Sequence, residues 1–292
     1  MKPPSFDYAA PNTVGEAVAM LQQHAGDAKI LAGGQSLMPL LNMRLARPAL
    51  LVDVARIDGL DYIRDAEGSL AIGAMTRQRS VEHSDLVKRR FPLVHTATLH
   101  VAHPQNRNQG TVGGSLAHAD PAAEYPAVAL ALDAEFRAVG PAGERCINAA
   151  DFFLTYLTTA LEPAEVLTEV RFPALPPRTG WAFTEVARRH GDFALAGVVA
   201  WVACDGGGRC SAARIVLFGV GATPVRVRAT EQLLVGEQLS ERLFDHAGRK
   251  ASAEIDAPLS DVHASTEYRR ALASVLTRRT LAEATTRARA AV

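Results

Sequence analysis

This chain contains few cysteines, no apolar run long enough to span a membrane, and no excess of positive or negative charge. Its three cysteines, Cys146, Cys204 and Cys210, form no C-x-x-C pair, which excludes a disulfide framework and a metal or iron–sulfur set. No stretch approaches the roughly 18 apolar residues that a membrane span requires. Basic and acidic residues both number 31, so no net charge draws the chain to nucleic acid. Because the first residues lack a signal-peptide core, the sequence predicts a cytoplasmic protein.

Two glycine segments are the most informative features present. The first, Ala32-Gly33-Gly34-Gln35-Ser36, separates a short apolar run from a second run in which Pro39 suits a first helical turn. We read it as strand, glycine turn and helix start, with Ser36 as helix N-cap and backbone N–H groups directed at an anion. It is not G-x-G-x-x-G, and a plain turn that uses glycine for positive φ is the alternative.

The second segment, Gly110 to Ser115, repeats the Gly-Gly pair with flanking hydroxyls. We read it as a loop that supplies another set of backbone donors, so that the two segments clamp a diphosphate; two unrelated tight turns are the alternative. After it, Asp120-Pro121 predicts the start of a helix. Glu124, in the first turn of that helix, either accepts from ribityl or ribose hydroxyls or only favours the helix dipole.

The remaining polar clusters indicate no catalytic or metal site of their own. The amide-rich run 105–109 is typical of a solvated loop. The histidines at 95, 100, 103 and 118 match no zinc pattern. With no nucleophile elbow, triad or carboxylate pair, the sequence predicts no catalytic residue and no metal ligand, and any redox chemistry belongs to a cofactor.

The domain organisation follows from a change of pattern near residue 176. Capping-box spacing at Thr13 and Glu16 predicts a first helix, and strands and helices alternate as far as Leu175. Alternating apolar runs then predict an antiparallel sheet, followed by helices over 240–254 and 268–290. We therefore expect a first domain over 1–176, with parts of about 1–55 and 56–176, and a second over 177–292.

The stretches "LAGGQSLMPLLNMRLARPALLVDV", "TVGGSLAHADPAAEYP" and "EVARRHGDFALAG" resemble the FAD-binding medium subunit of molybdenum hydroxylases, which include xanthine dehydrogenases and bacterial carbon monoxide dehydrogenases. The resemblance spans nearly the whole chain. It implies an α+β fold: a two-part FAD-binding domain of the vanillyl-alcohol-oxidase-like (PCMH) type, then a smaller C-terminal α/β domain with an antiparallel sheet and helices.

By resemblance, the two glycine segments bind the FAD diphosphate, Val101 and Ala102 lie near the isoalloxazine, and His118 and Glu124 lie near the ribityl or adenosine part. Leu167 would contact the ring system and Phe193 would lie close to the flavin. Some relatives have lysine at the position of Glu185, so no contact is carried over to that residue. The implied cofactor-binding residues are Leu31, Ala32, Gly33, Gly34, Gln35, Ser36, Leu37, Val101, Ala102, Thr111, Gly113, Gly114, Ser115, His118, Glu124, Leu167 and Phe193.

The resemblance also implies a function in electron transfer. The chain would take electrons from a [2Fe–2S] small subunit, fed by a molybdopterin large subunit, in a heterotrimer that pairs into a dimer of heterotrimers. It would pass them to an acceptor such as NAD, a quinone or oxygen. Two alternatives remain: a self-contained FAD-dependent oxidoreductase of the same fold, and a non-catalytic FAD-binding protein.

Overall fold

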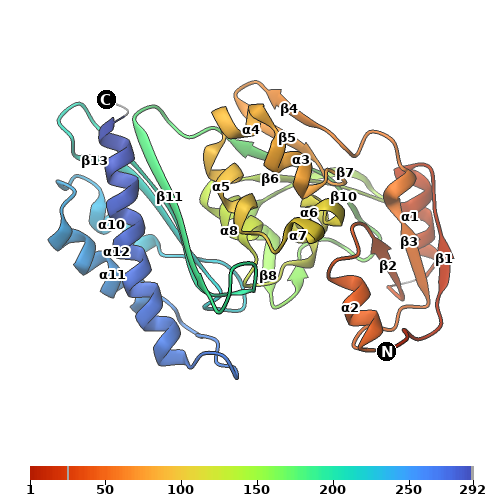
Figure 1. The fold of residues 1–292 in the computed structure, drawn as a ribbon. Helices are drawn as coiled ribbons and strands as arrows, with labels where there is room; N and C mark the ends of the chain where they lie inside the picture. The colour runs from red at the N-terminus through yellow and green to blue at the C-terminus, as the bar shows by residue number, and fades with distance from the viewer. Residues whose placement is uncertain (25, 291–292) are drawn as a thin grey trace.

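The computed structural model describes residues 1–24 and 26–290, in which three larger sheets follow one another along the chain, with a fourth, two-stranded sheet beside the second (Figure 1). The first sheet is parallel, in the order β1-β3-β2. Its strands are β1 (Asp7–Ala9), β2 (Ala28–Leu31) and β3 (Leu50–Asp53), joined by helices α1 (Val14–Gln23) and α2 (Leu37–Asn42) and followed by the 3-10 helix η1 (Val54–Arg56). The Thr13 hydroxyl accepts a hydrogen bond from the Glu16 backbone N–H, which confirms the predicted start of α1.

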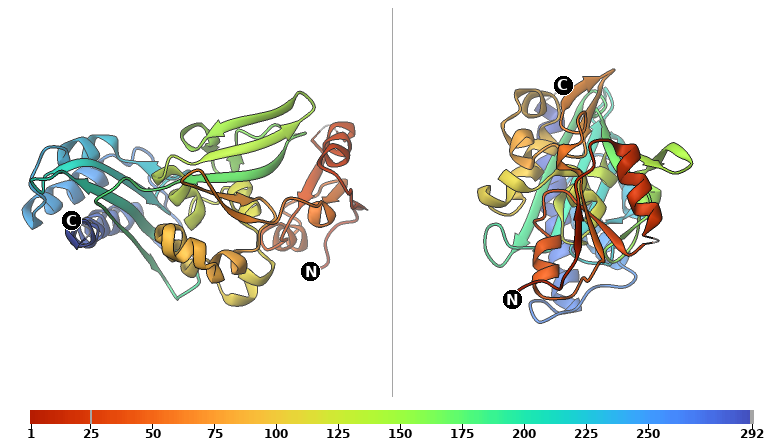
Figure 2. Two further views of the ribbon diagram at one scale, coloured as in Figure 1. Left: turned by 90° about the horizontal axis from the view of Figure 1, so that it is seen from above. Right: turned by 90° about the vertical axis from the view of Figure 1, so that its right-hand side faces the viewer.

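The second sheet is antiparallel, in the order β4-β5-β10-β6-β7. Its strands are β4 (Ile63–Ala66), β5 (Ser69–Gly73), β6 (Glu135–Gly140), β7 (Gly143–Asn148) and β10 (Val166–Pro173). Its helices are α3 (Gln78–His83), α4 (Asp85–Arg90), α5 (Pro92–His100), α6 (Pro104–Gln109), α7 (Val112–His118), α8 (Glu124–Ala131) and α9 (Ala149–Phe152), and the hairpin β8 (Phe153–Thr155) and β9 (Thr158–Thr159) follows α9. Figure 2 shows strands of this sheet on one side of the unit and helices on the other.

Three sequence predictions for this region are wrong. The amide-rich run forms helix α6, and the second Gly-Gly pair lies inside helix α7 instead of in a loop. Asp120-Pro121 does not start α8, which begins at Glu124. The Asp120 carboxylate instead accepts a hydrogen bond from the Ala122 N–H at 2.8 Å, closing a short turn before the helix.

The third sheet is the predicted antiparallel one, in the order β11-β12-β13-β14. Its strands are β11 (Thr179–Ala187), β12 (Ala194–Cys204), β13 (Cys210–Phe218) and β14 (Val225–Arg226), and its helices are α10 (Arg228–Leu234), α11 (Glu241–Ala253) and α12 (Thr266–Ala290). The predicted α+β architecture, with a C-terminal antiparallel sheet and helices, is thereby confirmed.

Strand β12 is buried along its whole length because both faces of its sheet are covered. One face, with Val199 and Trp201, joins the core of the second unit, and the other, with Val198 and Ala200, packs under α10–α12. This explains why β12 is an almost unbroken apolar run and not a simple alternation. A smaller core around Val18 and Val52 lies in the first unit and extends to Met75 and Val166 of the second unit.

Helix α12 lies directly on the backbone of β11 at Gly180 (Figure 1). A Cβ at Gly180 would overlap the Ala284 carbonyl oxygen and lie 2.9 Å from the Ala288 Cα. We therefore expect Gly180→Ala to lower the free energy of unfolding by about 1–3 kcal/mol, because a 25-residue helix would have to shift.

Urea denaturation followed by circular dichroism measures this effect. Gly206→Ala is the matched control, because its nearest neighbour is the flexible Arg178 side chain at 3.7 Å, and it should change stability by less than about 0.5 kcal/mol. Equal stability of the two variants would contradict the proposed close packing.

Candidate functional site

The first glycine segment connects β2 to α2 and leaves its backbone donors free. Within the part of the chain that the structure describes, no acceptor receives the N–H groups of residues 33–36, and the first donor to find one is the Met38 N–H, bonded to the Gly34 carbonyl at 3.0 Å. Gly34 has φ +69°, which favours glycine. Ser36 occupies the predicted N-cap position, but its hydroxyl makes no capping bond. Uncompensated N–H groups of this kind bind anionic oxygens.

The second glycine segment differs, because its donors already have protein partners. The N–H groups of Val112 and Gly113 donate to the carbonyls of Thr76 and Ala74 at 3.0 and 2.9 Å, and the Gly114 N–H donates to the Thr111 hydroxyl at 3.1 Å. The expected second set of free backbone donors is therefore absent at these three positions. Gly113 instead permits close packing, since a Cβ there would lie 2.5 Å from that of Ala74.

The two segments meet although about 75 residues separate them in the sequence. A Cβ on Gly33 would overlap the Gln109 carbonyl oxygen and lie 2.9 Å from the Gly110 Cα. The Asn106 side-chain amide donates to the Gln35 side chain at 3.2 Å across the same contact. In Figure 1, α6 and α7 accordingly lie beside β2 and α2. The structure thus places an open row of N–H donors next to the start of α7.

The turn that contains Val101 and Ala102 is held by a buried arginine that the sequence analysis missed. Ala102 has φ +42°, an uncommon conformation for a residue with a side chain. The Arg107 guanidinium donates to the carbonyls of Val101 and Ala102 at 2.8 and 3.3 Å and forms a bidentate pair with Glu82 at 2.9 and 3.1 Å. Pro104 at the first position of α6 was the available sequence signal, because proline there is typical of a helix.

The other predicted binding residues lie in different environments. Glu124 is the first residue of α8 and is 7% exposed; burial, followed by the charge of Glu185, raises its pKa to about 8. His118 ends α7, and burial lowers its pKa. Leu167 is buried in the core of the second unit, whereas Phe193 lies in the β11–β12 turn and is 69% exposed. In the same turn, Gly191 abuts the His103 ring.

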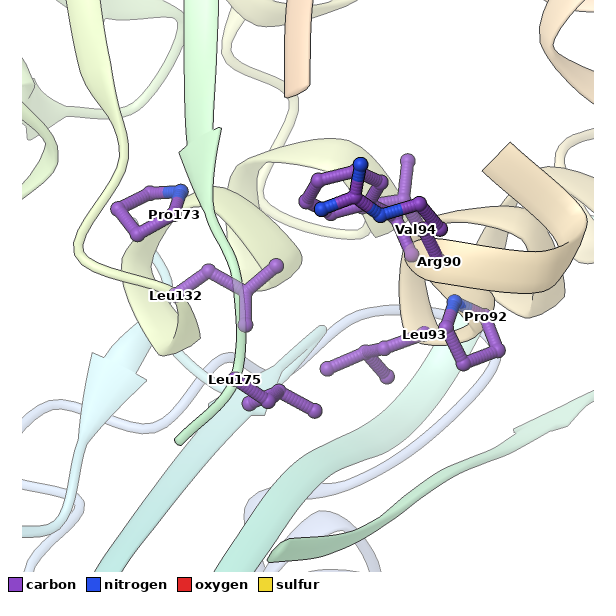
Figure 3. Close-up of a pocket in the computed structure, with 8 residues that line it drawn as sticks. Arg90, Pro92, Leu93, Val94, Leu132, Pro173 and Leu175 are labelled. Carbon is purple, nitrogen blue, oxygen red and sulfur yellow. The ribbon is translucent and has the colours of Figure 1, made fainter. Parts of the chain in front are cut away.

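A small pocket elsewhere in the second unit contains none of these residues (Figure 3). Leu93, Val94, Leu132 and Leu175 contribute its apolar lining, between α5 and the chain that leads into the third sheet. Among residues 1–24 and 26–290, no group of three or more histidine, cysteine or acidic side chains is arranged to hold a metal ion. None of the helices in these ranges combines the length and apolar character that crossing a membrane requires.

The chain is similar to known families and proteins over nearly its whole length. Residues 4–175 match the FAD binding domain in molybdopterin dehydrogenase, and residues 181–284 match the CO dehydrogenase flavoprotein C-terminal domain. The chain is 44% identical to 6-hydroxypseudooxynicotine dehydrogenase complex subunit alpha of Paenarthrobacter nicotinovorans, over 99% of this chain and 97% of that one. It is 40% identical to the carbon monoxide dehydrogenase medium chain of Hydrogenophaga pseudoflava, over 96% and 97% of the two chains.

Solved structures show the same fold. A chain of the Hydrogenophaga pseudoflava carbon monoxide dehydrogenase that lacks the Mo-pyranopterin moiety matches with a TM-score of 0.95 and 40% identity, over 98% of this chain and 99% of that one. A chain of quinoline 2-oxidoreductase from Pseudomonas putida 86 matches with a TM-score of 0.93 and 38% identity, over 99% of both chains.

The fold and the family matches define a flavoprotein that binds FAD. This chain belongs to the family of FAD-binding medium subunits of molybdenum hydroxylases. Its residues fit that cofactor, because backbone N–H groups without acceptors can bind a diphosphate. The close contact at Gly33, which a Cβ would fill, brings the second glycine segment beside these N–H groups.

Removal of the Arg107 guanidinium should destabilise the chain. In Arg107→Met the Glu82 carboxylate loses its buried partner and the Val101 and Ala102 carbonyls lose their donor, so we expect the free energy of unfolding to fall by about 3 kcal/mol. Urea denaturation provides the measurement. Arg279→Met removes an exposed arginine and should cost less than about 0.5 kcal/mol; an Arg107→Met variant as stable as this control would refute the positioning role.

Glu124 should make the stability of the cofactor-free chain depend on pH. Its pKa is about 8 in the folded chain and 4.5 as a model value, so between these values the folded chain binds a proton that the unfolded chain releases. The free energy of unfolding should therefore fall as pH rises from about 5 to 8, by up to about 1.4 kcal/mol per pH unit. Glu124→Gln should flatten this slope in urea titrations at several pH values. Identical slopes in variant and wild type would exclude the buried carboxyl as the cause.

Proposed function

We propose that this chain is the electron-transferring FAD subunit of a heterotrimeric molybdenum-containing dehydrogenase. It would take electrons from a [2Fe–2S] subunit and pass them to an external acceptor such as NAD, a quinone or oxygen. The single observation that carries the proposal is the row of N–H groups without acceptors at residues 33–36, after β2, where Gly33 lies against the end of α6. Family membership supports the assembly, because the relatives are named as subunits of multi-part dehydrogenases.

The proposed role of the chain's own residues is to bind and orient the cofactor. Residues 33–36 donate to the diphosphate, with Thr111 and Ser115 beside them, and Arg107 fixes the Val101–Ala102 turn next to the ring. When bound, FAD supplies the capacity to accept and release electrons. No acid–base residue of this chain is required for that task. We also propose that residues 1–176 form the FAD-binding domain and 177–292 the C-terminal one, in a cytoplasmic complex of paired heterotrimers.

The substrate is not assigned to this chain. Relatives with similar identity to this chain are named for 6-hydroxypseudooxynicotine, carbon monoxide and caffeine. Sequence similarity between medium subunits therefore does not indicate the substrate. We propose that the substrate is recognised by the molybdenum subunit, which is a separate polypeptide.

The decisive experiment is anaerobic reduction of the flavin in the co-expressed complex. Substrate should bleach the flavin absorption band only when the iron–sulfur and molybdenum subunits are both present. Bleaching of the isolated chain by an organic substrate would favour a self-contained oxidoreductase. A flavin that dithionite reduces but the partner subunits do not would favour a non-catalytic FAD-binding protein.

Substitution of Gly33 tests the binding site directly. In Gly33→Ala the new Cβ overlaps the Gln109 carbonyl oxygen, so we expect the purified chain to contain far less than one FAD per polypeptide. Acid release and chromatography measure the content. Gly15→Ala in α1 is the matched control, because a Cβ there would lie 4.0 Å from its nearest neighbour, the Thr13 hydroxyl, and it should retain the wild-type content. Full FAD content in Gly33→Ala would argue against the site.

A further inference from the structure

Two of the three cysteines face each other across neighbouring strands of the C-terminal sheet. Cys204 ends β12 and Cys210 begins β13, and the two residues are direct partners in the antiparallel register. Both are free thiols, and both side chains belong to the core that α10–α12 cover. Their spacing in the sequence matches no cysteine motif, so it is the hairpin between β12 and β13 that brings the two thiols together.

The backbone hydrogen bonds around this pair indicate a close approach of the two side chains. The N–H groups of Cys204 and Cys210 both donate to carbonyls outside the pair, at 3.2 and 3.0 Å, and the next bond across the hairpin runs from the Asp205 N–H to the Arg209 carbonyl at 2.8 Å. The pair is therefore of the non-hydrogen-bonded type, in which opposite Cα atoms lie about 4.5 Å apart and the side chains are closest. A disulfide joins Cα atoms that are about 4.4–6.8 Å apart, so the register suits such a bond.

The surroundings of the two thiols differ in access to solvent. Cys210 is 1% exposed, and its thiol donates a weak bond to the Ala212 carbonyl at 3.4 Å. Cys204 is 6% exposed and adjoins the exposed turn residues 205–207, while Ser211, which the register leaves unpaired, is exposed on the opposite strand. Cys204 is thus the thiol that a small molecule reaches first.

The titration of the pair agrees with the proximity of the two sulfur atoms. Burial, followed by the charge of Cys204, raises the pKa of the Cys210 thiol to about 12, and burial also raises the pKa of Cys204. Because a thiolate is the reactive form of cysteine, oxidation of this pair should be slow near neutral pH and should accelerate as the pH rises.

We propose that Cys204 and Cys210 form a modification site, at which hydrogen peroxide oxidises the two thiols to a disulfide. The Cys204 thiolate attacks one peroxide oxygen, the O–O bond breaks, and hydroxide leaves, which converts Cys204 to a sulfenic acid. The Cys210 sulfur then attacks the Cys204 sulfur, and the S–O bond breaks with loss of water. The sulfurs lose two electrons and the peroxide gains them, so two thiols and one peroxide give one disulfide and two water molecules. The inference does not depend on the binding of FAD.

The bond would fix the end of the hairpin, which already contacts the segment before α11. The Gly236 N–H donates to the Cys210 carbonyl at 2.7 Å, and the Arg209 guanidinium donates to the Gly236 carbonyl at 3.0 Å. A link between Cys204 and Cys210 would restrict the unfolded chain without moving these contacts. The oxidised chain should therefore melt about 5 °C above the reduced chain.

The test uses the full-length chain with Cys146→Ser, which removes the exposed third cysteine and leaves only the pair. After treatment with hydrogen peroxide, the free thiols counted with Ellman's reagent in denaturant should fall from two to none, and the mass of the chain should fall by about 2 Da. Dithiothreitol should restore both thiols. In the matched control, Cys146→Ser with Cys204→Ala, the buried Cys210 thiol has no partner and should remain reduced over the same time.

Three results would overturn the inference. The first is retention of both thiols in the Cys146→Ser chain after prolonged treatment. The second is a mass that rises by about 16 Da or more without a cross-link, which would show that one thiol is oxidised and the other cannot reach it. The third is an oxidised chain that melts below the reduced chain, because the bond would then distort the sheet instead of joining sulfurs that already lie together.

Discussion

The contact between the backbone of Gly33 and that of Gln109 and Gly110 is the constraint on which the site depends. It joins two units that also share a hydrophobic cluster, in which Val18 and Val52 pack with Met75 and Val166, and it tolerates no side chain at Gly33. The N–H groups of Gly33 to Ser36 stay open because they lie at the start of α2, where the first donors of a helix have no partner within it. The packing of the two units then places α6 and the start of α7 beside these donors.

The C-terminal sheet contributes to the site by holding α8 near both of its ends. The Gly219 N–H donates to the Pro121 carbonyl at 2.7 Å before the helix, and the Trp201 indole donates to the Ala131 carbonyl at 2.8 Å at its last residue. Just after α8, Asp133 forms an ion pair with Arg214 at 2.6 Å. Glu124 lies between these anchors, so its buried position depends on the sheet. The burial of both faces of β12 thus links the C-terminal unit to the candidate site.

Sequence patterns predicted the elements whose hydrophobic faces are regular, such as α1, β3, and β11 to β13. They failed where tertiary contacts override local preference. Gly113 and Gly114 each disfavour a helix by about 1 kcal/mol, yet α7 forms because Thr111 caps it and Ala74 and Thr76 accept its first N–H groups. The segment around Arg107 was interpreted as a solvated loop because the sequence does not reveal the partners of this arginine. Glu82 is distant in the sequence, and Val101 accepts through its backbone carbonyl. Motif resemblance indicated the glycine segments, but no local pattern reveals that Gly33 lies against Gln109 and Gly110.

The polarity of the site indicates where the charged part of the proposed ligand would lie. Around Gly33 the open groups are N–H donors, which stabilise negative charge and repel cations. Near the start of α8, burial raises the pKa of Glu124 to about 8, so this carboxyl is mostly neutral at pH 7 and does not add a negative charge to the site. The diphosphate of FAD lies between the ribityl chain and the adenosine ribose, and both of these arms carry hydroxyl groups. The donor row would therefore fix the place of the diphosphate, and the direction of the two arms would depend on the contacts that each arm makes.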